Sequence, residues 1–299
     1  MKKSIKFIST IFLLILFKNL YSYEIIRDPI FEDYFEKINK EFEHEIVDTY
    51  LVKNKSANAF VLNNNIYFTT GLLEIINNED TLKAIYLHEY GHIIKNHFQS
   101  KKIKIQQSDE KSNFYNLFSV GLAIVSGNIN MGVGTSITLN SNAINEISKF
   151  SVNFEIEADN FMIKELKKNE ISTSELISFL NKVPDPNMNY FRTHPRSENR
   201  INNLKKINYK PSFNSVKFEW IKSKYTKKSN NEAFNLFFKK LENGIFKEDE
   251  KLDNINEEII KYEAFKKGFL INNWNIYFQK LIKNNSNSFL KIEYINYLL

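Results

Sequence analysis

The hydrophobic and polar positions of the chain mostly repeat with the period of an α-helix. Apolar residues recur three and four positions apart among many Glu and Lys residues, which is the pattern of helices that bury one face. Asn78 supplies a cap, and Glu79 and Asp80 supply first-turn acids, for a helix that runs to about Phe98. The other helices predicted in the first two thirds of the chain cover 31–52, about 145–168 and 173–183.

One short region is instead rich in β-branched and aromatic residues. Asn58 to Leu62 and Ile66 to Gly71 flank a turn made of the Asn residues 63–65. Two such runs on either side of a turn predict a β-hairpin.

Beyond Lys206 the pattern changes to aromatic helical segments, which include Asn231 to Glu242 and Ile255 to Ile282. The second segment resembles the paired helices of TPR-like repeats, although barely two units are present and no clean period runs through them. The predicted fold class is mainly α (α+β), with a small β-hairpin or sheet. The predicted divisions are residues 1–22, a domain over 23–207 and a helical, TPR-like region over 208–299.

Residues 1–22 have the features of a signal peptide. A basic start precedes an apolar run from Phe7 to Phe17, and Ser22 offers a small residue for cleavage. The apolar run is well short of the roughly 20 residues that span a bilayer. We therefore expect an exported protein, with an uncleaved N-terminal anchor as the alternative.

A second apolar stretch, 114–139, is interrupted by four Gly residues and by Asn128 and Asn130. This composition favours a helical hairpin packed beside the functional site over a membrane span. Peripheral contact with a membrane is the alternative interpretation.

Charge and cysteine content limit the possible partners and metal ligands of the protein. Four of the 41 basic residues lie within 1–22, so 37 remain against 35 acidic ones, and this balance argues against a nucleic-acid partner. The chain contains no Cys, which removes disulfides and thiolate metal ligands. Histidine and carboxylate groups must therefore hold any metal.

The strongest motif is His88-Glu89-Tyr90-Gly91-His92, within a predicted helix. Two histidines four residues apart project from one helical face and can hold one Zn²⁺. Zinc lowers the pKa of a bound water to about 7, and Glu89 is placed to accept its proton. Gly91 destabilises a helix by about 1 kcal/mol relative to Ala, which suggests that another backbone or a substrate comes close.

A catalytic zinc needs a third protein ligand and one open position. Glu155 and Asp159 lie four residues apart, so one could bind zinc while the other hydrogen-bonds a ligand histidine. Glu157 points away by roughly 200° and is expected to face solvent or a structural partner.

The pairing of His-Glu-Tyr-Gly-His with Glu-Ile-Glu-Ala-Asp resembles the HtpX-, BepA- and CAAX prenyl endopeptidase-like family of zinc metallopeptidases, over about 23–207. The resemblance implies that Glu155 is the third zinc ligand and that Asp159 supports a ligand. A further family feature, His-Pro followed by Arg-Ile, corresponds to His194-Pro195 and Arg200-Ile201. It implies that His194 acts as a transition-state donor or a reversible metal contact, and that Arg200 organises the carboxylates.

The chain departs from the family pattern in one place. Members often carry Ser-Arg before the acidic motif, whereas this chain has Ser151-Val152, and Arg192 is the candidate to replace that arginine. His97 lies five residues beyond His92, a poor ligand spacing, and no role is assigned to it or to His44.

The resulting hypothesis is a zincin-type metalloendopeptidase that cleaves unfolded or extended polypeptides with one Zn²⁺ per chain. The edge of the hairpin could pair with an extended substrate. The BepA-like branch implies a periplasmic location in a bacterial envelope, quality control of exported or misfolded envelope proteins, and partner binding by the C-terminal helices. The competing hypothesis is a periplasmic chaperone-like binding module whose metal site is latent or structural. An integral membrane prenyl-protein processing enzyme would need several long apolar helices, which the sequence does not provide.

Overall fold

The computed structural model describes residues 22–106, 138–140, 152–181, 194, 198–285 and 287–299. The strands are β1 (Ser22–Ile26), β2 (Thr49–Lys53), β3 (Ala59–Leu62), β4 (Asn65–Thr69) and β5 (Thr138–Asn140). The helices are α2 (Pro29–Glu41), α3 (Thr70–Ile75), α4 (Glu79–Ile94), α5 (His97–Gln106), α8 (Val152–Lys168), α9 (Ser174–Asn181), α11 (Glu198–Leu204), α12 (Val216–Thr226), α13 (Glu232–Glu242), α14 (Glu257–Lys266), α15 (Trp274–Asn284) and α16 (Ser288–Leu298). The predicted fold class, mainly helical with a small sheet, is confirmed.

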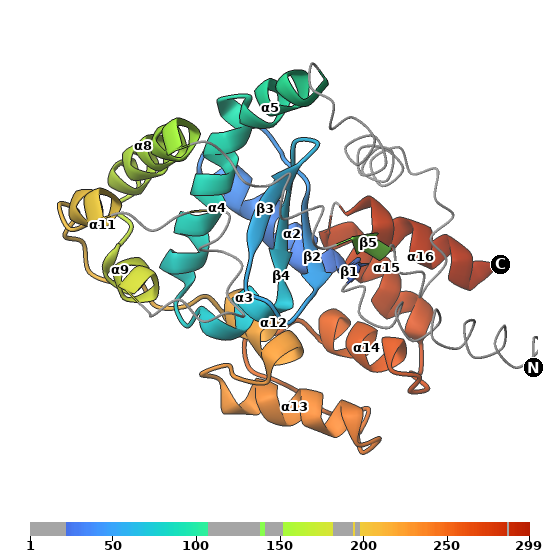
Figure 1. Ribbon diagram of the computed structural model, residues 1–299. Helices are drawn as coiled ribbons and strands as arrows, with labels where there is room; N and C mark the ends of the chain where they lie inside the picture. Colours follow the sequence, from blue (N-terminus) through green and yellow to red (C-terminus); the bar gives the residue numbers. More distant parts are fainter. Residues whose placement is uncertain (1–21, 107–137, 141–151, 182–193, 195–197, 286) are drawn as a thin grey trace, which may run out of the picture.

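The five strands form one sheet in the order β3-β4-β2-β1-β5, in which only β2 and β4 pair in parallel. The predicted hairpin is β3 and β4. Its turn residues Asn63 and Asn64 have φ values of 51° and 60°, and a type I′ turn requires positive φ at both central residues. In Figure 1 the sheet and α4 lie between α8 and α11 on one side and α14 to α16 on the other.

The helix predicted over 31–52 is too long. It ends at Glu41, and Glu43 follows with a left-handed φ of 57°. The run Thr49–Lys53 then forms the buried strand β2. Aromatic and β-branched residues favour a strand here once the sheet buries them.

Helices α4 and α8 cross closely and carry most of the predicted site. Asn78 caps α4 as expected, since its side chain accepts a hydrogen bond from the Asp80 amide. A Cβ added to Gly91 would lie 3.1 Å from the Ala158 backbone. Gly91 is therefore the point at which the α8 backbone approaches α4, as the sequence suggested.

The helix predicted to run to Phe98 is interrupted. α4 ends at Ile94, Asn96 has a φ of 55°, and a new helix, α5, begins at His97. Asn tolerates this left-handed conformation better than most residues, so it permits the break.

The C-terminal helices enclose a second apolar core built around Trp220 and Trp274. The segment predicted as helical over 255–282 is two helices, because Gly268, with a φ of 86°, lies between α14 and α15. The Lys224 ammonium links α14 to the start of α2, since it lies 2.5 Å from Glu263 on α14 and 2.9 Å from Asp28, the N-cap of α2.

Within the described residues, no helix combines the length and apolarity needed to cross a bilayer. The predicted signal peptide lies outside these residues except for Ser22, which begins β1. The apolar stretch 114–139 lies outside them apart from its last two residues, and Arg192 also lies outside them.

Candidate metal centre and active site

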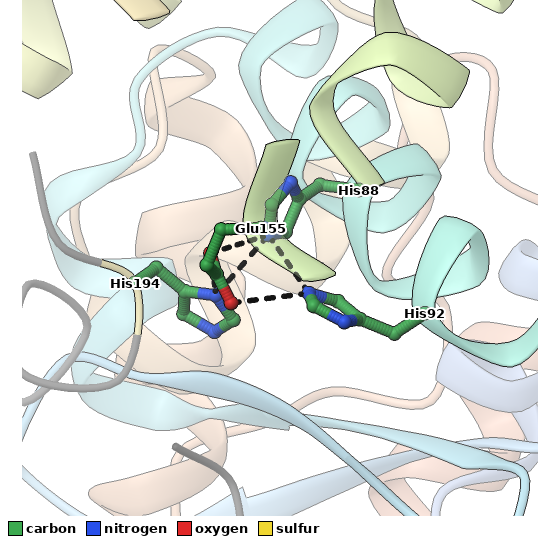
Figure 2. A group of neighbouring side chains, drawn as sticks. All are labelled: His88, His92, Glu155 and His194. Carbon is green, nitrogen blue, oxygen red and sulfur yellow. Dashed lines mark hydrogen bonds and ion pairs between the residues drawn. The ribbon is translucent and has the colours of Figure 1, made fainter. Parts of the chain in front are cut away.

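Four side chains from three separate parts of the chain meet beside the sheet. His88 and His92 stand on consecutive turns of α4, Glu155 stands on the first turn of α8, and His194 comes from the segment before α11 (Figure 2). All four are buried, and one donor atom from each lies within 4.8 Å of the others. We call these four residues the four-donor cluster.

The contacts within the four-donor cluster are short. His88 Nε2 lies 3.2 Å from His92 Nε2 and 3.1 Å from His194 Nδ1. Glu155 Oε2 lies 3.3 Å from His88 Nε2 and 3.0 Å from His194 Nδ1, and its Oε1 lies 3.4 Å from His92 Nε2. The sequence-predicted ligands are thus together, with His194 as a fourth donor.

The outer nitrogen of His88 is held by Asp159. Its Nδ1 lies 2.9 Å from Asp159 Oδ1, and Arg200 Nη2 lies 2.9 Å from the same oxygen. An ionised carboxylate only accepts hydrogen bonds, so the His88 Nδ1 carries the proton. The Nε2 of His88 therefore faces the cluster, and Arg200 fixes the carboxylate that sets this arrangement.

The outer nitrogen of His92 is held by His97, which Glu157 holds in turn. His92 Nδ1 lies 2.9 Å from His97 Nδ1, and His97 Nε2 lies 3.1 Å from Glu157 Oε2. Glu157 accepts the His97 Nε2 proton, which leaves His97 Nδ1 to accept the proton of His92 Nδ1. The Nε2 lone pair of His92 then also faces the cluster.

Glu157 is half exposed and pairs with His97, in line with the expectation that it faces solvent or a structural partner. His97, to which no role was assigned, lies beside His92. The five-residue spacing argued against His97 only for a continuous helix, but α4 ends at Ile94 and the turn at Asn96 brings His97 beside His92. Phe154 stacks on the His97 ring at 4.1 Å. An Asn just before the histidine was the one sequence signal of this break.

The His194 ring also turns one nitrogen toward the four-donor cluster and the other away from it. Its Nε2 donates to the carbonyl of Ala59 at 3.3 Å and lies 3.2 Å from Glu89 Oε1. Its Nδ1 is left facing His88 and Glu155.

The donor set fits a metal ion. Three imidazole nitrogens and one carboxylate converge on a buried point, and a cation would satisfy all four donors. Burial and Arg200 lower the pKa of His88, but hydrogen bonds to Asp159 and Glu155 outweigh them and raise it to about 9. Burial raises the pKa of Glu155, but His194 and His88 hold it well below its usual range. Nitrogen and oxygen donors without sulfur are a usual zinc set.

Glu89 lies beside the four-donor cluster and contributes no donor to it. Its side chain is fully buried, and within the described part of the chain neither of its oxygens accepts a hydrogen bond of ordinary geometry. Burial raises the pKa of its carboxyl group. A buried carboxylate with free acceptor capacity and a raised pKa is suited to accept a proton from water.

His44, the fifth histidine, lies on the opposite side of α4. Its ring stacks on Tyr90 at 4.5 Å, and its Nε2 lies 3.3 Å from Glu165 Oε2. It packs α4 against α8 and belongs to no metal-donor cluster among the residues that the structure describes.

Comparison with known proteins gives one family match. The model of peptidase family M48 matches residues 27–208. No curated protein matches. Among solved structures, the crystal structure of S. mikatae Ste24p is similar to this chain at 17% identity and a TM-score of 0.34, covering 61% of this chain and 51% of that one, so the match spans about half of that protein. The family match confirms the broad resemblance predicted from the sequence, and the BepA-like branch stays a prediction.

Proposed function

Because the chain belongs to peptidase family M48, we propose that it is a zinc-dependent endopeptidase of exported or misfolded envelope proteins. The observation that carries the proposal is the four-donor cluster with Glu89 beside it. A purely structural metal site needs no general base at its edge.

His88, His92 and Glu155 would hold the ion, and bound zinc would polarise the scissile carbonyl and acidify a water molecule. Glu89 accepts the proton of that water and passes it to the leaving amine. Asp159 and Arg200 keep His88 oriented, and His97 with Glu157 does the same for His92. No covalent intermediate with the protein is needed.

The edge of the sheet supports an extended substrate. β3 pairs only with β4 among the described strands, and the carbonyl of Ala59 on β3 lies within 3.3 Å of His194. A substrate strand added to this edge would run past the four-donor cluster, with affinity from main-chain hydrogen bonds. This arrangement favours unfolded or extended polypeptides over folded ones.

The periplasmic location and the envelope substrates rest on the leader-like residues 1–22 and on the resemblance to the BepA-like branch. The C-terminal helices would provide a surface for envelope protein partners.

One observation favours the second candidate, a chaperone-like module with a latent or structural metal site. His194 gives the cluster four protein donors, which is the ligand count of a closed structural site. If the site is catalytic and latent, His194→Ala keeps zinc, opens one position and raises activity several-fold. In a structural site the same change produces no activity.

The proposal is tested by digestion of casein by the purified protein with and without a zinc chelator. We expect Glu89→Gln to keep zinc and the fold but to lose about 10²–10⁴-fold in rate, because an amide cannot accept the proton. Glu175→Gln, at an exposed position on α9, is the matched control and should digest casein as the wild type does. Activity of Glu89→Gln within a few-fold of wild type would remove Glu89 from the mechanism.

A further inference from the structure

A cavity of about 210 Å³ lies where α2, α12 and α15 meet the segment that leads into α14. Its lining residues include none of the four-donor cluster or of the residues that orient it. Its walls combine an apolar surface with a group of charged and amide side chains, which is the composition of sites for small organic ligands.

The charged end of the cavity carries an excess of positive charge. Asp33 on α2, which is buried, pairs with Lys217 and, at 3.1 Å, with Lys37. Two ammonium groups thus share one carboxylate. Burial and the like charge of Lys37 lower the pKa of Lys217, although Asp33 raises it. An incoming anion would supply the charge that this group lacks.

The N-termini of two helices add to the positive potential of the cavity. Val216 and Lys217 begin α12, and Asn256 precedes the first residue of α14; all three line the cavity. The Asn256 side chain makes no cap hydrogen bond, in contrast to Ser215, which caps α12. The first amides of α14 therefore have no side-chain acceptor at the cap, and helix starts favour anions.

Most of the other lining residues are apolar. They include Ile30, Ile255, Ile259, Leu281 and Trp220. The Trp220 Nε1 is buried and has no hydrogen-bond partner among the described residues. A cavity of about 150 Å³ holds benzene, so this one has room for a ligand of about eight non-hydrogen atoms.

We propose that this cavity binds a carboxylate carrying a short branched apolar chain, with the carboxylate at Lys37 and Lys217 and the chain against Ile255 and Ile259, beneath which Trp220 is buried. Two sources share this chemistry: a free short-chain acid, and the C-terminus of a peptide that ends in an apolar residue. The proposal does not depend on the peptidase activity.

The direct test follows the two indole N–H signals of the full-length protein by NMR, since the chain has two Trp residues. The probe is 4-methylpentanoate, which we expect to move the Trp220 signal saturably with a Kd on the order of 1 mM. The Trp274 signal, identified with Trp274→Phe, is the internal control. The uncharged 4-methylpentanamide and inorganic phosphate should each bind at least tenfold more weakly.

A second arm distinguishes the two sources. Acetyl-alanyl-leucine is compared with its C-terminal amide: binding of the free peptide but not of the amide supports a peptide C-terminus, and binding of 4-methylpentanoate alone supports a small acid. Equal affinity for 4-methylpentanoate and its amide, or no shift of the Trp220 signal, overturns the proposal.

Variants test the same site in two directions. Lys217→Met and Lys37→Met should each weaken binding about tenfold, because each removes a charge-assisted contact. Asp33→Asn should tighten it, because the competing carboxylate is gone. The control is Lys240→Met, which should leave binding unchanged. The Lys240 side chain is about as exposed as that of Lys217 and pairs with Glu250 outside the cavity. Unchanged binding in both Lys217→Met and Asp33→Asn contradicts the proposal even if one variant is less stable.

Discussion

The protonation of each ligand ring is set by a residue behind it. Asp159 accepts from His88, and Glu157 orders the proton of His92 through His97. The outer nitrogens of both rings are therefore held by hydrogen bonds, and the inner nitrogens are the ones that face the metal position. Such outer partners typically change metal affinity or activity by 10–100-fold when they are removed.

This arrangement changes the effect expected for one of the acids Glu155, Glu157 and Asp159 of α8. Glu155→Ala removes a donor and should weaken zinc binding most. Asp159→Ala should weaken it by about 10–100-fold. Glu157→Ala, which the helical-face argument alone treats as nearly silent, should now weaken zinc binding measurably, and by less than Asp159→Ala, because it is half exposed and acts through His97.

Competition with a chromophoric zinc chelator measures this order, with the exposed Glu175→Gln as the control. Zinc affinity of Glu157→Ala equal to wild type would show that Glu157 does not order His92. A larger loss for Glu157→Ala than for Glu155→Ala would move the ligand assignment to Glu157.

The pKa of His88 gives a pH dependence for metal binding. In the metal-free protein, hydrogen bonds to Asp159 and Glu155 raise the pKa of His88 to about 9, against burial and Arg200, which lower it. Zinc must displace that proton, so its affinity should fall by about tenfold for each pH unit below 9. Chelator competition at several pH values between 6.5 and 9 checks this slope. An affinity that is constant over this range would show that His88 is already neutral.

At the scale of elements, the site depends on how closely α4 and α8 approach. Gly91 sits within the zinc motif, and a Cβ at this position would lie 3.1 Å from both the Cα and the carbonyl oxygen of Ala158. The glycine is thus a packing requirement that also sets the distance of Glu155 from His88 and His92.

We therefore expect Gly91→Val to lower the free energy of unfolding by about 1–3 kcal/mol, because it forces α8 away from α4. Zinc affinity should fall with it, since Glu155 moves with α8. Thermal unfolding and zinc titration of the same preparation measure the two effects. A variant as stable as wild type, with unchanged zinc affinity, would mean that the two helices do not depend on this contact.

The sequence predicted the helices around the site well because their caps and apolar periods are local. It failed where tertiary burial or a single left-handed residue decides the outcome. Thr49–Lys53 became a strand only because the sheet buries it, and α4 stopped before His97 because of the turn at Asn96. The meeting of His88, His92 and Glu155 could be predicted, whereas the link from Glu157 to His92 could not, because it exists only after that turn forms.

At the scale of the whole molecule, the peptidase half and the C-terminal helices share buried ionic contacts. Lys224 bridges Asp28 and Glu263, and the Lys222 ammonium donates to the carbonyls of Leu73 and Ile76 at the end of α3. Buried charges of this kind are costly unless they are fully paired. The C-terminal helices are therefore packed against the metal-binding half rather than joined to it by a flexible linker.

The most direct test of a catalytic zinc centre adds Zn²⁺ stepwise to metal-free protein while casein hydrolysis is measured. We expect activity to rise with added zinc and to reach a plateau at about one zinc per chain, since the described residues bring together one such donor cluster. Full activity of the metal-free protein would contradict a catalytic zinc centre. So would a protein that binds one zinc and gains no activity even when His194 is replaced by Ala.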